Sequence, residues 1–407
     1  MTTEQSSKEA VFRRQVRTWL KTNLPKGWGT PEYKAPERQS EAAQALGEQW
    51  TKTCYDAGYA GFGYPKEYGG IVRPDWEIRI IREEFALCGT PPGPMSQGLL
   101  MAAPTILRWG QEWQKKRFIP KILSGEESWC QGFSEPDAGS DLANVRTAAV
   151  RNGDDWVVNG QKVWTSNWTY ADFGLLVVKT DPVAKRHRNL SYFIFDCNSP
   201  GFSRRPLKQM SGESEFGEMF FDNVRVPHKN LLGELNMGWY VALTGLAAER
   251  SGGFAVGGRS TARRGWGNME SIVALAKETK RYGKTVWDDP VFRQKIAQFA
   301  IEGEAMRANG ALQAAMSRQG KKIDPNEVSV SKNFSAELRQ RSDDMVMEIL
   351  GAYSQMVEGS PLAVNDGDWV YGMLRWRGAT IERGTSEINR NIIAEKILGM
   401  PREARSE

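Results

Sequence analysis

The sequence predicts a multidomain α+β fold in three successive parts: a helical domain at residues 1–125, an all-β domain at residues 126–235 and a helical bundle at residues 236–407. Apolar residues recur at intervals of three and four in the first and last parts, which is the period of an amphipathic helix. Short apolar runs bounded by Gly, Asn, Asp and Pro lie between them and are typical of strands in a barrel or sandwich. The chain of 407 residues is also longer than the roughly 250–300 residues at which a single core stops growing.

The N-terminal domain is expected to consist of helices at residues 10–24, 42–54, 78–87 and 104–123. Gly and Pro separate these segments, and both residues disfavour a continuing helix. Ser124-Gly125 is expected to end the last of them, because glycine is the usual residue just past a helix end.

In the middle domain, Asn159-Gly160 is the strongest turn signal of the chain. The pair lies between the apolar segments 156–158 and 162–164, and Asn-Gly is the preferred pair of a two-residue hairpin loop. We therefore expect a hairpin centred on Asn159-Gly160. Residues 191–196 and 218–221 are expected to add further strands to the same barrel or sandwich.

After Gly238 the helical spacing returns over long stretches, at residues 239–258, 267–282, 290–319, 328–351 and 385–398. Long helices joined by short loops favour a bundle.

Composition argues against several classes of partner and site. The 54 basic and 49 acidic residues are interleaved along the chain, so the net charge of +5 predicts no nucleic-acid partner. Only two histidines are present, which leaves little material for a metal site or a Ser-His-Asp triad. Neither the G-x-G-x-x-G pattern of a Rossmann site nor a P-loop pattern occurs, so a nucleotide cofactor would have to be held in another way.

The sequence also favours a cytoplasmic protein without a membrane partner. No segment approaches the ~20 continuous apolar residues that are needed to cross a bilayer. The N-terminal stretch MTTEQSSKEAVFRRQ lacks the apolar core of a signal peptide. Four cysteines, at positions 54, 88, 130 and 197, form no C-x-x-C pair and are expected to be free thiols.

A loop rich in small residues, Gln131-Gly-Phe-Ser-Glu-Pro-Asp-Ala-Gly-Ser-Asp141, joins the first helices to the first strands. Such a loop can approach a phosphate or a flat ring closely, because glycine permits a tight backbone and successive N–H groups form an anion-binding concavity. A connecting loop without a ligand has the same composition. Both interpretations stay open on composition alone.

Glu249 lies in a strongly helical segment, three residues after Leu246 and seven before Val256, so its carboxylate projects from an apolar stripe. A carboxylate in an apolar pocket has a raised pKa and can act as a base near neutral pH. Taken alone, however, the segment favours a structural carboxylate paired with an arginine, since such carboxylates outnumber catalytic ones.

Near the C-terminus, residues 380–399 combine a loop with the start of a helix. Thr385 or Ser386 would cap this helix, and the free N–H groups of its first turn could receive an anion or a ring oxygen. The residues alone favour capping without a ligand, because most caps serve only the helix.

Three motifs of this chain, in order, resemble those of the acyl-CoA dehydrogenase family. Ser134-Glu-Pro-Asp-Ala-Gly-Ser-Asp141 is similar to the family's [ST]-E-P-x-[AG]-G-S-D loop, and Gly160-Gln-Lys-Val-Trp-Thr-Ser-Asn167 to its G-x-K-x-W-[IT]-[ST]-N segment. Residues 384–399 resemble its G-T-S-x-I-x-R-x-I-[IV]-A-x-x-[IL]-L-G segment. The likeness runs over nearly the whole chain and implies an N-terminal helical domain, a middle β domain and a C-terminal four-helix bundle.

The resemblance also implies an FAD cofactor between the β domain and the bundle, held partly by a neighbouring subunit. The residues implied to meet the isoalloxazine ring are Gln131, Phe133 and Ser134 on one side and Trp164 and Ser166 on the other. Those implied near the pyrophosphate, the adenosine or the CoA are Gly139, Ser140, Thr385 and Glu387.

The catalytic base is where this chain departs from the usual family pattern. Many members have a glutamate immediately before Gly-Thr-Ser, where this chain has Arg383. A branch of the family places its base on the first long bundle helix, immediately before an arginine, and Glu249-Arg250 resembles that arrangement. The resemblance therefore implies that Glu249 is the base. Substrate contacts are expected from Ser140, Arg250, Arg383 and Gly384.

The implied reaction removes two hydrogens from the α and β carbons of an acyl-CoA thioester. Glu249 takes the α proton, hydride passes from the β carbon to flavin N5, and the backbone N–H of Arg383 helps to polarise the thioester carbonyl. Gly252 and Gly253 remove side chains near the acyl group and predict a branched, cyclic or otherwise bulky acyl chain.

Two further departures concern the distal end of the flavin. Thr279 stands where the family often has an arginine, and Glu348 where a glutamine is expected. The resemblance implies a homotetramer that passes electrons to an electron-transferring flavoprotein. The departures keep open a heterotetramer with a second acyl-CoA dehydrogenase-like subunit, in which this chain would be non-catalytic or half-catalytic. An acyl-CoA oxidase that uses oxygen is a further alternative.

Overall fold

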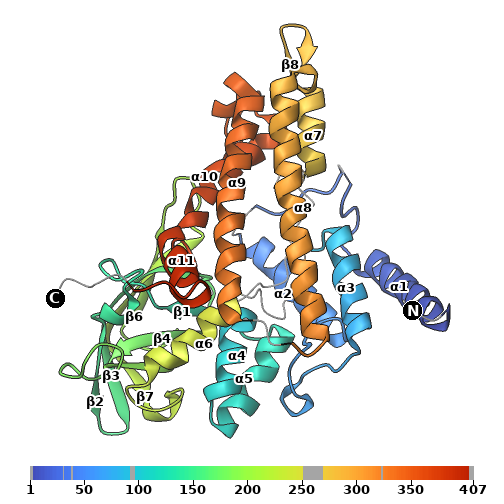
Figure 1. Ribbon diagram of the computed structural model, residues 1–407. Helices are drawn as coiled ribbons and strands as arrows, with labels where there is room; N and C mark the ends of the chain where they lie inside the picture. The colour runs from blue at the N-terminus through green and yellow to red at the C-terminus, as the bar shows by residue number, and fades with distance from the viewer. Residues whose placement is uncertain are drawn as a thin grey trace. The chain divides into compact units, whose positions relative to one another are not determined.

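The computed structural model describes residues 3–30, 32–37, 40–91, 97–250, 269–321 and 324–402. The chain forms two compact units, Met1–Ala262 and Arg263–Glu407, and each is described by itself. The first unit contains the N-terminal helices, the sheet and helix α6 (Gly238–Arg250), and the second contains the later helices (Figure 1). The predicted order of a helical, a β and a second helical part is therefore confirmed.

The helices that precede the sheet are α1 (Thr3–Asn23), α2 (Glu41–Asp56), α3 (Asp75–Cys88), α4 (Ala103–Trp109) and α5 (Glu112–Ser124). The single helix predicted at residues 104–123 is two helices. Gly110 has an extended backbone between them, and Gln111 forms a capping box with Gln114 that starts α5. Gly125 ends α5 in the left-handed conformation, with φ +76°, as predicted.

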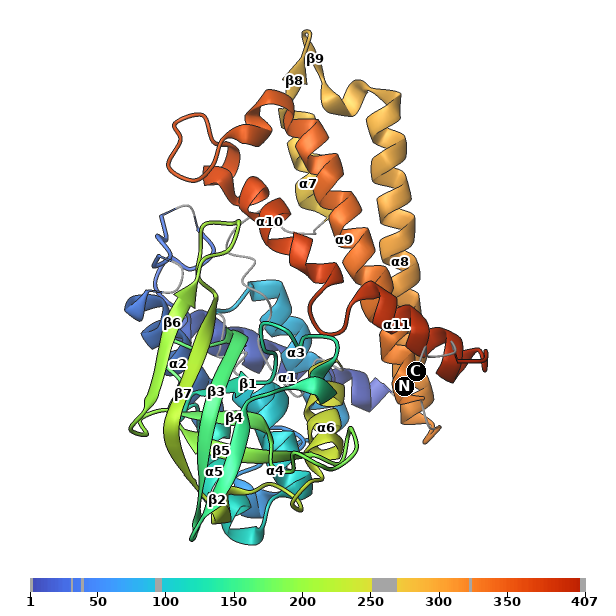
Figure 2. The same cartoon turned by 90° about the vertical axis from the view of Figure 1, so that its left-hand side faces the viewer.

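The sheet of the first unit consists of β1 (Trp129–Gly132), β2 (Ala148–Asn152), β3 (Asp155–Ser166), β4 (Phe173–Lys179), β5 (Leu190–Asp196), β6 (Phe202–Leu207) and β7 (Phe216–Pro227). The strand order is β1-β4-β2-β3-β7-β6, and β5 pairs with β4 outside this path. β1 runs parallel to β4, whereas β3 pairs antiparallel with both β2 and β7. Figure 2 shows β3 running along β7 for most of its length.

The prediction of a hairpin at Asn159-Gly160 is wrong, because β3 continues through this pair. Asn223 of β7 donates its backbone N–H to Asn159 Oδ1 at 2.8 Å, and the pairing register between β3 and β7 shifts here. Such a shift is a β-bulge, in which an extra residue is accommodated without reversing the chain. The hairpin lies instead at Gly153-Asp154, between β2 and β3.

Side chains of β4 and β5 alternate between two apolar cores. Leu175 and Val177 lie in a core shared with the helices, whereas Leu176 and Val178 lie in a second core within the sheet. Successive side chains of a strand point to opposite faces, so strands that are buried on both faces have continuous apolar sequences. The corresponding residues of β5 are Tyr192 and Ile194 in the first core and Phe193 and Phe195 in the second.

Helix α6 carries Glu249 and belongs to the first unit. Its residues Val241 and Ala242 are buried in the core shared with the sheet, and Trp109 at the end of α4 donates its indole N–H to Thr244 at 2.8 Å. The helix was predicted to continue to residue 258, but residues 251–258 lie outside the described residues.

The second unit contains α7 (Met269–Glu278), α8 (Pro290–Arg318), α9 (Val328–Leu350), α10 (Asp368–Trp376) and α11 (Ser386–Ile392). The helix predicted at residues 267–282 ends at Glu278, because the chain then forms a small hairpin of β8 (Lys280–Arg281) and β9 (Lys284–Thr285). Its turn, Tyr282-Gly283, has positive φ at both residues. No helix among the described residues is long and apolar enough to cross a membrane.

Gly238 is predicted to be essential for seating α6 on the sheet. A Cβ at this position would lie 2.5 Å from the carbonyl carbon and 2.6 Å from the Cα of Ser191, which are backbone atoms that cannot rotate away. Gly238→Ala should therefore destabilise the first unit by about 1–3 kcal/mol, as overpacking usually does. The measurement is the thermal unfolding midpoint.

Gly303→Ala is the matched control, because a Cβ at Gly303 of α8 would meet nothing within 4 Å among the described residues. Alanine also favours a helix interior over glycine, so this control should keep or raise the midpoint. Equal midpoints for Gly238→Ala and wild type would contradict the close approach of α6 to β5.

Candidate functional site

The first unit brings together the loop after β1 and the last residues of β3, two segments that the resemblance implies bind one ligand. Val163 donates its backbone N–H to the Ser134 carbonyl at 2.9 Å. Lys162 donates from Nζ to the Phe133 carbonyl at 3.0 Å and to Glu135 Oε1 at 2.8 Å. Predicted site residues Phe133 and Ser134 are thus joined directly to the strand that carries Trp164 and Ser166.

Trp164 has an unusual backbone and an accessible ring. Its φ is +61°, the pairing register of β3 with β7 shifts between Lys162 and Thr165, and 54% of its surface is exposed. A bulky residue rarely adopts a positive φ, and such strain, of order 1–3 kcal/mol, is concentrated at functional sites. The bulge turns the indole out of the sheet, where it meets the ring of Phe216 edge to face, at 5.8 Å between ring centroids.

Polar atoms in this part of the unit are buried without a hydrogen-bond partner among the described residues. They include Oε1 of Gln131 on β1 and Oγ1 of Thr165 on β3. Buried polar groups are normally paired, so unpaired ones indicate a place where a ligand or water binds. An exposed indole on β3 and unsatisfied polar atoms on β1 and β3 are compatible with binding of a flat ring that carries hydrogen-bonding groups.

The rest of the loop leaves its small residues accessible. Glu135 and Ala138 exchange two backbone hydrogen bonds of 3.0 Å each, which closes a tight turn. Gly139 and Ser140 follow this turn and are exposed. Asp141 forms an ion pair with Arg186 of the segment between β4 and β5. The exposed Gly139-Ser140 backbone is therefore available to an anionic group.

In the second unit, Thr385 caps α11. Its hydroxyl oxygen accepts the backbone N–H of Ile388 at 3.2 Å, which confirms Thr385 rather than Ser386 as the capping residue. Glu387 lies exposed in the first turn, where hydrogen bonds from its own backbone and from Thr385 lower the pKa of its carboxyl group. Predicted residues Thr385 and Glu387 thus share one helix start.

The turn before α11 is held through its backbone. Arg383 and Gly384 have φ values of +57° and +83°. Lys332 of α9 donates to the Gly384 carbonyl at 2.5 Å, and buried Asn389 donates to the same carbonyl at 2.8 Å. Burial, and then the charge of Arg383, lowers the pKa of Lys332. Neither Lys332 nor Asn389 stands out in the sequence, because their contacts with this carbonyl form only when the turn is folded.

The carboxylate next to the turn is already paired. Glu382 accepts from Arg375 and from Arg383, each at 3.3 Å. At the distal positions, Glu348 pairs with Lys295, and Arg281 donates to the carbonyl oxygens of Glu348 and Ile349 at the end of α9. Arg281, two residues after Thr279, therefore serves a helix end.

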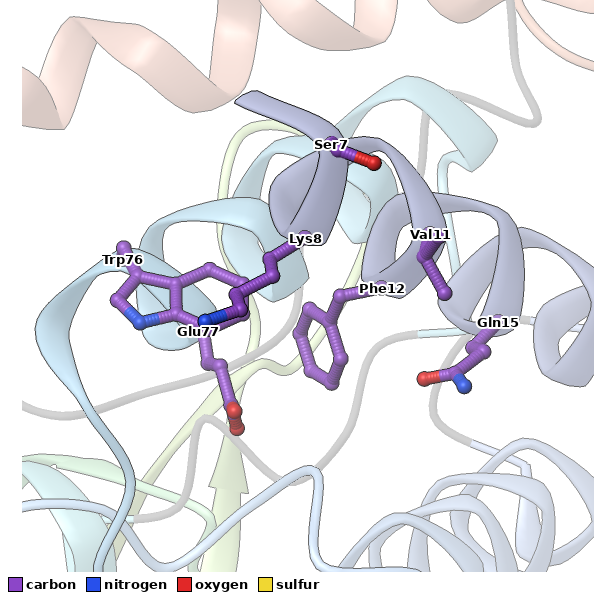
Figure 3. A pocket seen from close by; sticks show the side chains of 7 residues that line it. All are labelled: Ser7, Lys8, Val11, Phe12, Gln15, Trp76 and Glu77. Carbon is purple, nitrogen blue, oxygen red and sulfur yellow. The ribbon is translucent and has the colours of Figure 1, made fainter. Parts of the chain in front are cut away.

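Some predicted site residues are not described in full. Glu249 and Arg250 are the last residues of α6, and their side chains lie outside the described part of the structure, as do Gly252 and Gly253 entirely. Figure 3 shows side chains that line a shallow groove between α1 and α3, among them the rings of Phe12 and Trp76. None of the predicted site residues lines this groove.

Comparison with known proteins gives the same family for each part of the chain. Sequence models of the acyl-CoA dehydrogenase N-terminal, middle and C-terminal domains match residues 6–126, 130–224 and 236–398. The chain is 34% identical to acyl-CoA dehydrogenase IpdE1 of Mycobacterium tuberculosis, over 97% of this chain and 98% of that protein. It is 35% identical to IpdE1 of Mycolicibacterium smegmatis, over 97% and 98%.

Two solved structures are also similar. The steroid ACAD Tcur3481-Tcur3483 has a TM-score of 0.78 and 30% identity, with 98% of each chain covered. The ChsE4-ChsE5 complex of Mycobacterium tuberculosis has a TM-score of 0.75 and 31% identity, with 97% of this chain and 98% of that chain covered.

The substitution Thr385→Ala tests whether Thr385 only caps α11 or also contacts the cofactor. The substitution removes the acceptor for the Ile388 N–H and should destabilise α11 by about 1 kcal/mol, whereas Thr385→Ser keeps the acceptor and should be near wild type. Thermal unfolding measures the cap, and FAD titration measures the ligand. A stability loss in the alanine variant without weaker FAD binding would reduce Thr385 to a helix cap.

Proposed function

The chain belongs to the acyl-CoA dehydrogenase family, and from this membership we propose that it converts an acyl-CoA thioester to the 2-enoyl-CoA. Members of the family are flavin-dependent oxidoreductases, and we assign FAD as the cofactor of this chain. The assignment is supported by the exposed indole of Trp164 on β3, together with the unsatisfied polar atoms of Gln131 on β1 and Thr165 on β3.

FAD, when bound, accepts the hydride that leaves the β carbon. In the first unit, the residues proposed to hold it are Gln131, Phe133, Ser134, Gly139, Ser140, Trp164 and Ser166. In the second unit they are Thr385 and Glu387, at the start of α11. Backbone N–H groups at a helix start favour an anion, which supports a place for phosphate oxygens there.

Glu249 is proposed as the base that takes the α proton. Arg383 cannot fill this role, because a guanidinium stays protonated in proteins. Glu382, its neighbour, accepts from Arg375 and Arg383 and is committed to these ion pairs. Glu249 directly precedes Arg250 on α6, as in the family branch with its base on this helix.

Arg383 is proposed to act through its backbone. An N–H group at this position would donate to the thioester carbonyl and stabilise the negative charge that develops as the proton leaves. Besides its ion pair with Glu382, the guanidinium is proposed to make a second contact, with Glu249 or with a carboxylate on the acyl group. Arg250 and Gly384 complete the proposed substrate contacts, together with Ser140.

The acyl group is proposed to be bulky and polycyclic. Gly252 and Gly253 follow the proposed base and carry no side chains that would fill the space around it. The relative Tcur3481-Tcur3483 is a steroid ACAD, and its likeness over 98% of both chains supports a steroid-like acyl group here. Electron-transferring flavoprotein is the proposed acceptor and the cytoplasm the proposed location.

For the oligomeric state, a homotetramer is the first candidate and a heteromeric enzyme the second. ChsE4-ChsE5 is a complex of two named components, and this chain has Thr279 and Glu348 where the family often has an arginine and a glutamine. Purifying the chain alone and recording its flavin absorbance decides between them. A colourless, inactive protein that a second subunit revives would favour a half-catalytic role. Production of hydrogen peroxide without reduction of an artificial dye would favour the third alternative, an acyl-CoA oxidase that uses oxygen.

Glu249→Gln should slow anaerobic bleaching of the flavin by about 10²–10⁴-fold, which is the usual contribution of a general base. The measurement is a stopped-flow screen over straight-chain, branched and polycyclic acyl-CoA thioesters. Glu382→Gln is the control, because it removes the carboxylate next to Arg383 in the sequence, which is already paired with arginines, and it should bleach at nearly the wild-type rate. Retained bleaching in Glu249→Gln would remove Glu249 from its role.

Arg383→Lys and Arg383→Gly should keep the reaction and change the choice of acyl group. Both variants keep a backbone N–H, and glycine accepts the φ of +57° without strain, so the polarising contact is expected to survive. The readout is kcat/KM across the same thioester panel, with and without a terminal carboxylate. Identical profiles for wild type and both variants would exclude a substrate contact of the guanidinium.

A further inference from the structure

A buried ion pair connects two motifs that the sequence keeps apart. Lys162 on β3 has no exposed surface, and Glu135 in the loop after β1 is 7% exposed. The ammonium of Lys162 donates to Glu135 Oε1 at 2.8 Å and to the Phe133 carbonyl at 3.0 Å. Lys162 lies two residues before Trp164, and Glu135 directly follows Ser134. The pair therefore lies between the two segments proposed to face the flavin.

The Glu135 carboxylate extends this connection to a third segment. Its Oε2 accepts the backbone N–H of Arg146 at 2.6 Å, and its Oε1 accepts that of Thr147 at 2.9 Å. These two residues lead directly into β2. With the Val163 N–H donated to Ser134, the loop after β1, the start of β2 and the end of β3 are held to one buried cluster.

Close packing keeps the lysine side chain against β1. A Cβ on Gly132 would lie 3.3 Å from Lys162 Cγ, 2.8 Å from Leu176 Cδ1 and 2.9 Å from Met219 Cε. The absence of a side chain at Gly132 thus leaves the space in which these three side chains pack. The ammonium of Lys162 on β3 reaches the carbonyl of Phe133, the residue that follows β1.

Both groups are charged near neutral pH. Burial lowers the pKa of Lys162 to about 8, against the opposing effect of Glu135. Burial raises the pKa of Glu135, but the charge of Lys162 and the hydrogen bonds from Arg146 and Thr147 outweigh it and leave this pKa below its ordinary value. A buried pair of this kind is often no more stabilising than apolar side chains of the same size, so its directional bonds call for another explanation.

We propose that Lys162 is a positioning residue of the flavin site, which fixes the backbone of residues 133–135 against the bulge that presents Trp164. The proposal rests on the proposed function, since it takes these two segments to be walls of one flavin site. The ion pair makes four directional hydrogen bonds. Lys162 donates to Phe133 and to Glu135, and Glu135 accepts from the backbone N–H groups of Arg146 and Thr147. An apolar pair would supply none of them.

The test uses the full-length apoprotein with Lys162→Met, which keeps an unbranched side chain up to the ε position and removes the ammonium. Hydrogen exchange at the amides of Arg146, Thr147 and Val163 measures how well the buried cluster holds these backbone groups in the absence of flavin. A titration with FAD, followed by flavin fluorescence, measures the affinity of the site. Lys162→Met should speed exchange at these amides and raise the Kd for FAD, each by at least about tenfold, as expected when a buried charge loses its partner.

Two further variants make the result specific. Val226→Ala truncates a buried side chain of β7 that pairs with Trp156, at the far end of β3, and should lower the unfolding midpoint while leaving the three amides and the Kd unchanged. Lys162→Met combined with Glu135→Gln removes the uncompensated charge and should recover part of the FAD affinity. Should Lys162→Met fail to fold, Glu135→Gln alone is measured, with the same expected direction.

The outcomes separate this proposal from the proposed function. Unchanged exchange at Arg146, Thr147 and Val163 in Lys162→Met would overturn the role of the ion pair in holding the loop. Faster exchange with an unchanged Kd would overturn its role in the flavin site while leaving FAD as the cofactor. A wild-type protein that binds no FAD would overturn the proposed cofactor, and the positioning role with it, even if the amides respond.

Discussion

Strands β4 and β5 bury side chains on both faces, and this double burial determines where the candidate site forms. Leu175 and Val177 attach the sheet to the helices, while Leu176 and Val178 fill the core within the sheet. Because β1 pairs in parallel with β4, its position is fixed by the same packing. The loop after β1 therefore emerges from strands that are packed on both faces, which is what a site on a rigid scaffold requires.

A rigid scaffold also explains why a charged pair is tolerated in this interior. Removing an ammonium and a carboxylate from water is expensive, and only complete hydrogen bonding offsets it. Glu135 accepts from Lys162, Arg146 and Thr147, so its carboxylate is well satisfied. The strained backbone of Trp164 lies two residues along the strand, where the surrounding pairing holds it in place. Directional bonds and local strain thus occur together at one end of β3.

The spacing of apolar residues predicted the order of helices and strands, because this spacing reflects which face of each element is buried. It failed at Asn159-Gly160, where the sequence preference for a turn is met by a bulge opposite Asn223, a partner distant in the chain. The site was predicted as separate motifs from the resemblance, and their contacts were not. Lys162 and Glu135 are distant in sequence, and nothing local indicates that they pair, just as Lys332 gives no sign of its contact with Gly384.

The turn at Arg383 explains how this position can carry an arginine in place of a catalytic glutamate while the turn keeps its shape. The contacts that shape the turn come from Lys332 and Asn389 to the Gly384 carbonyl, so they do not involve the side chain of residue 383. The left-handed backbone there is consequently independent of whether a carboxylate or a guanidinium projects from it. A backbone donor can persist while the proton acceptor moves to another element. The proposed assignment of Glu249 on α6 requires this separation of the two tasks.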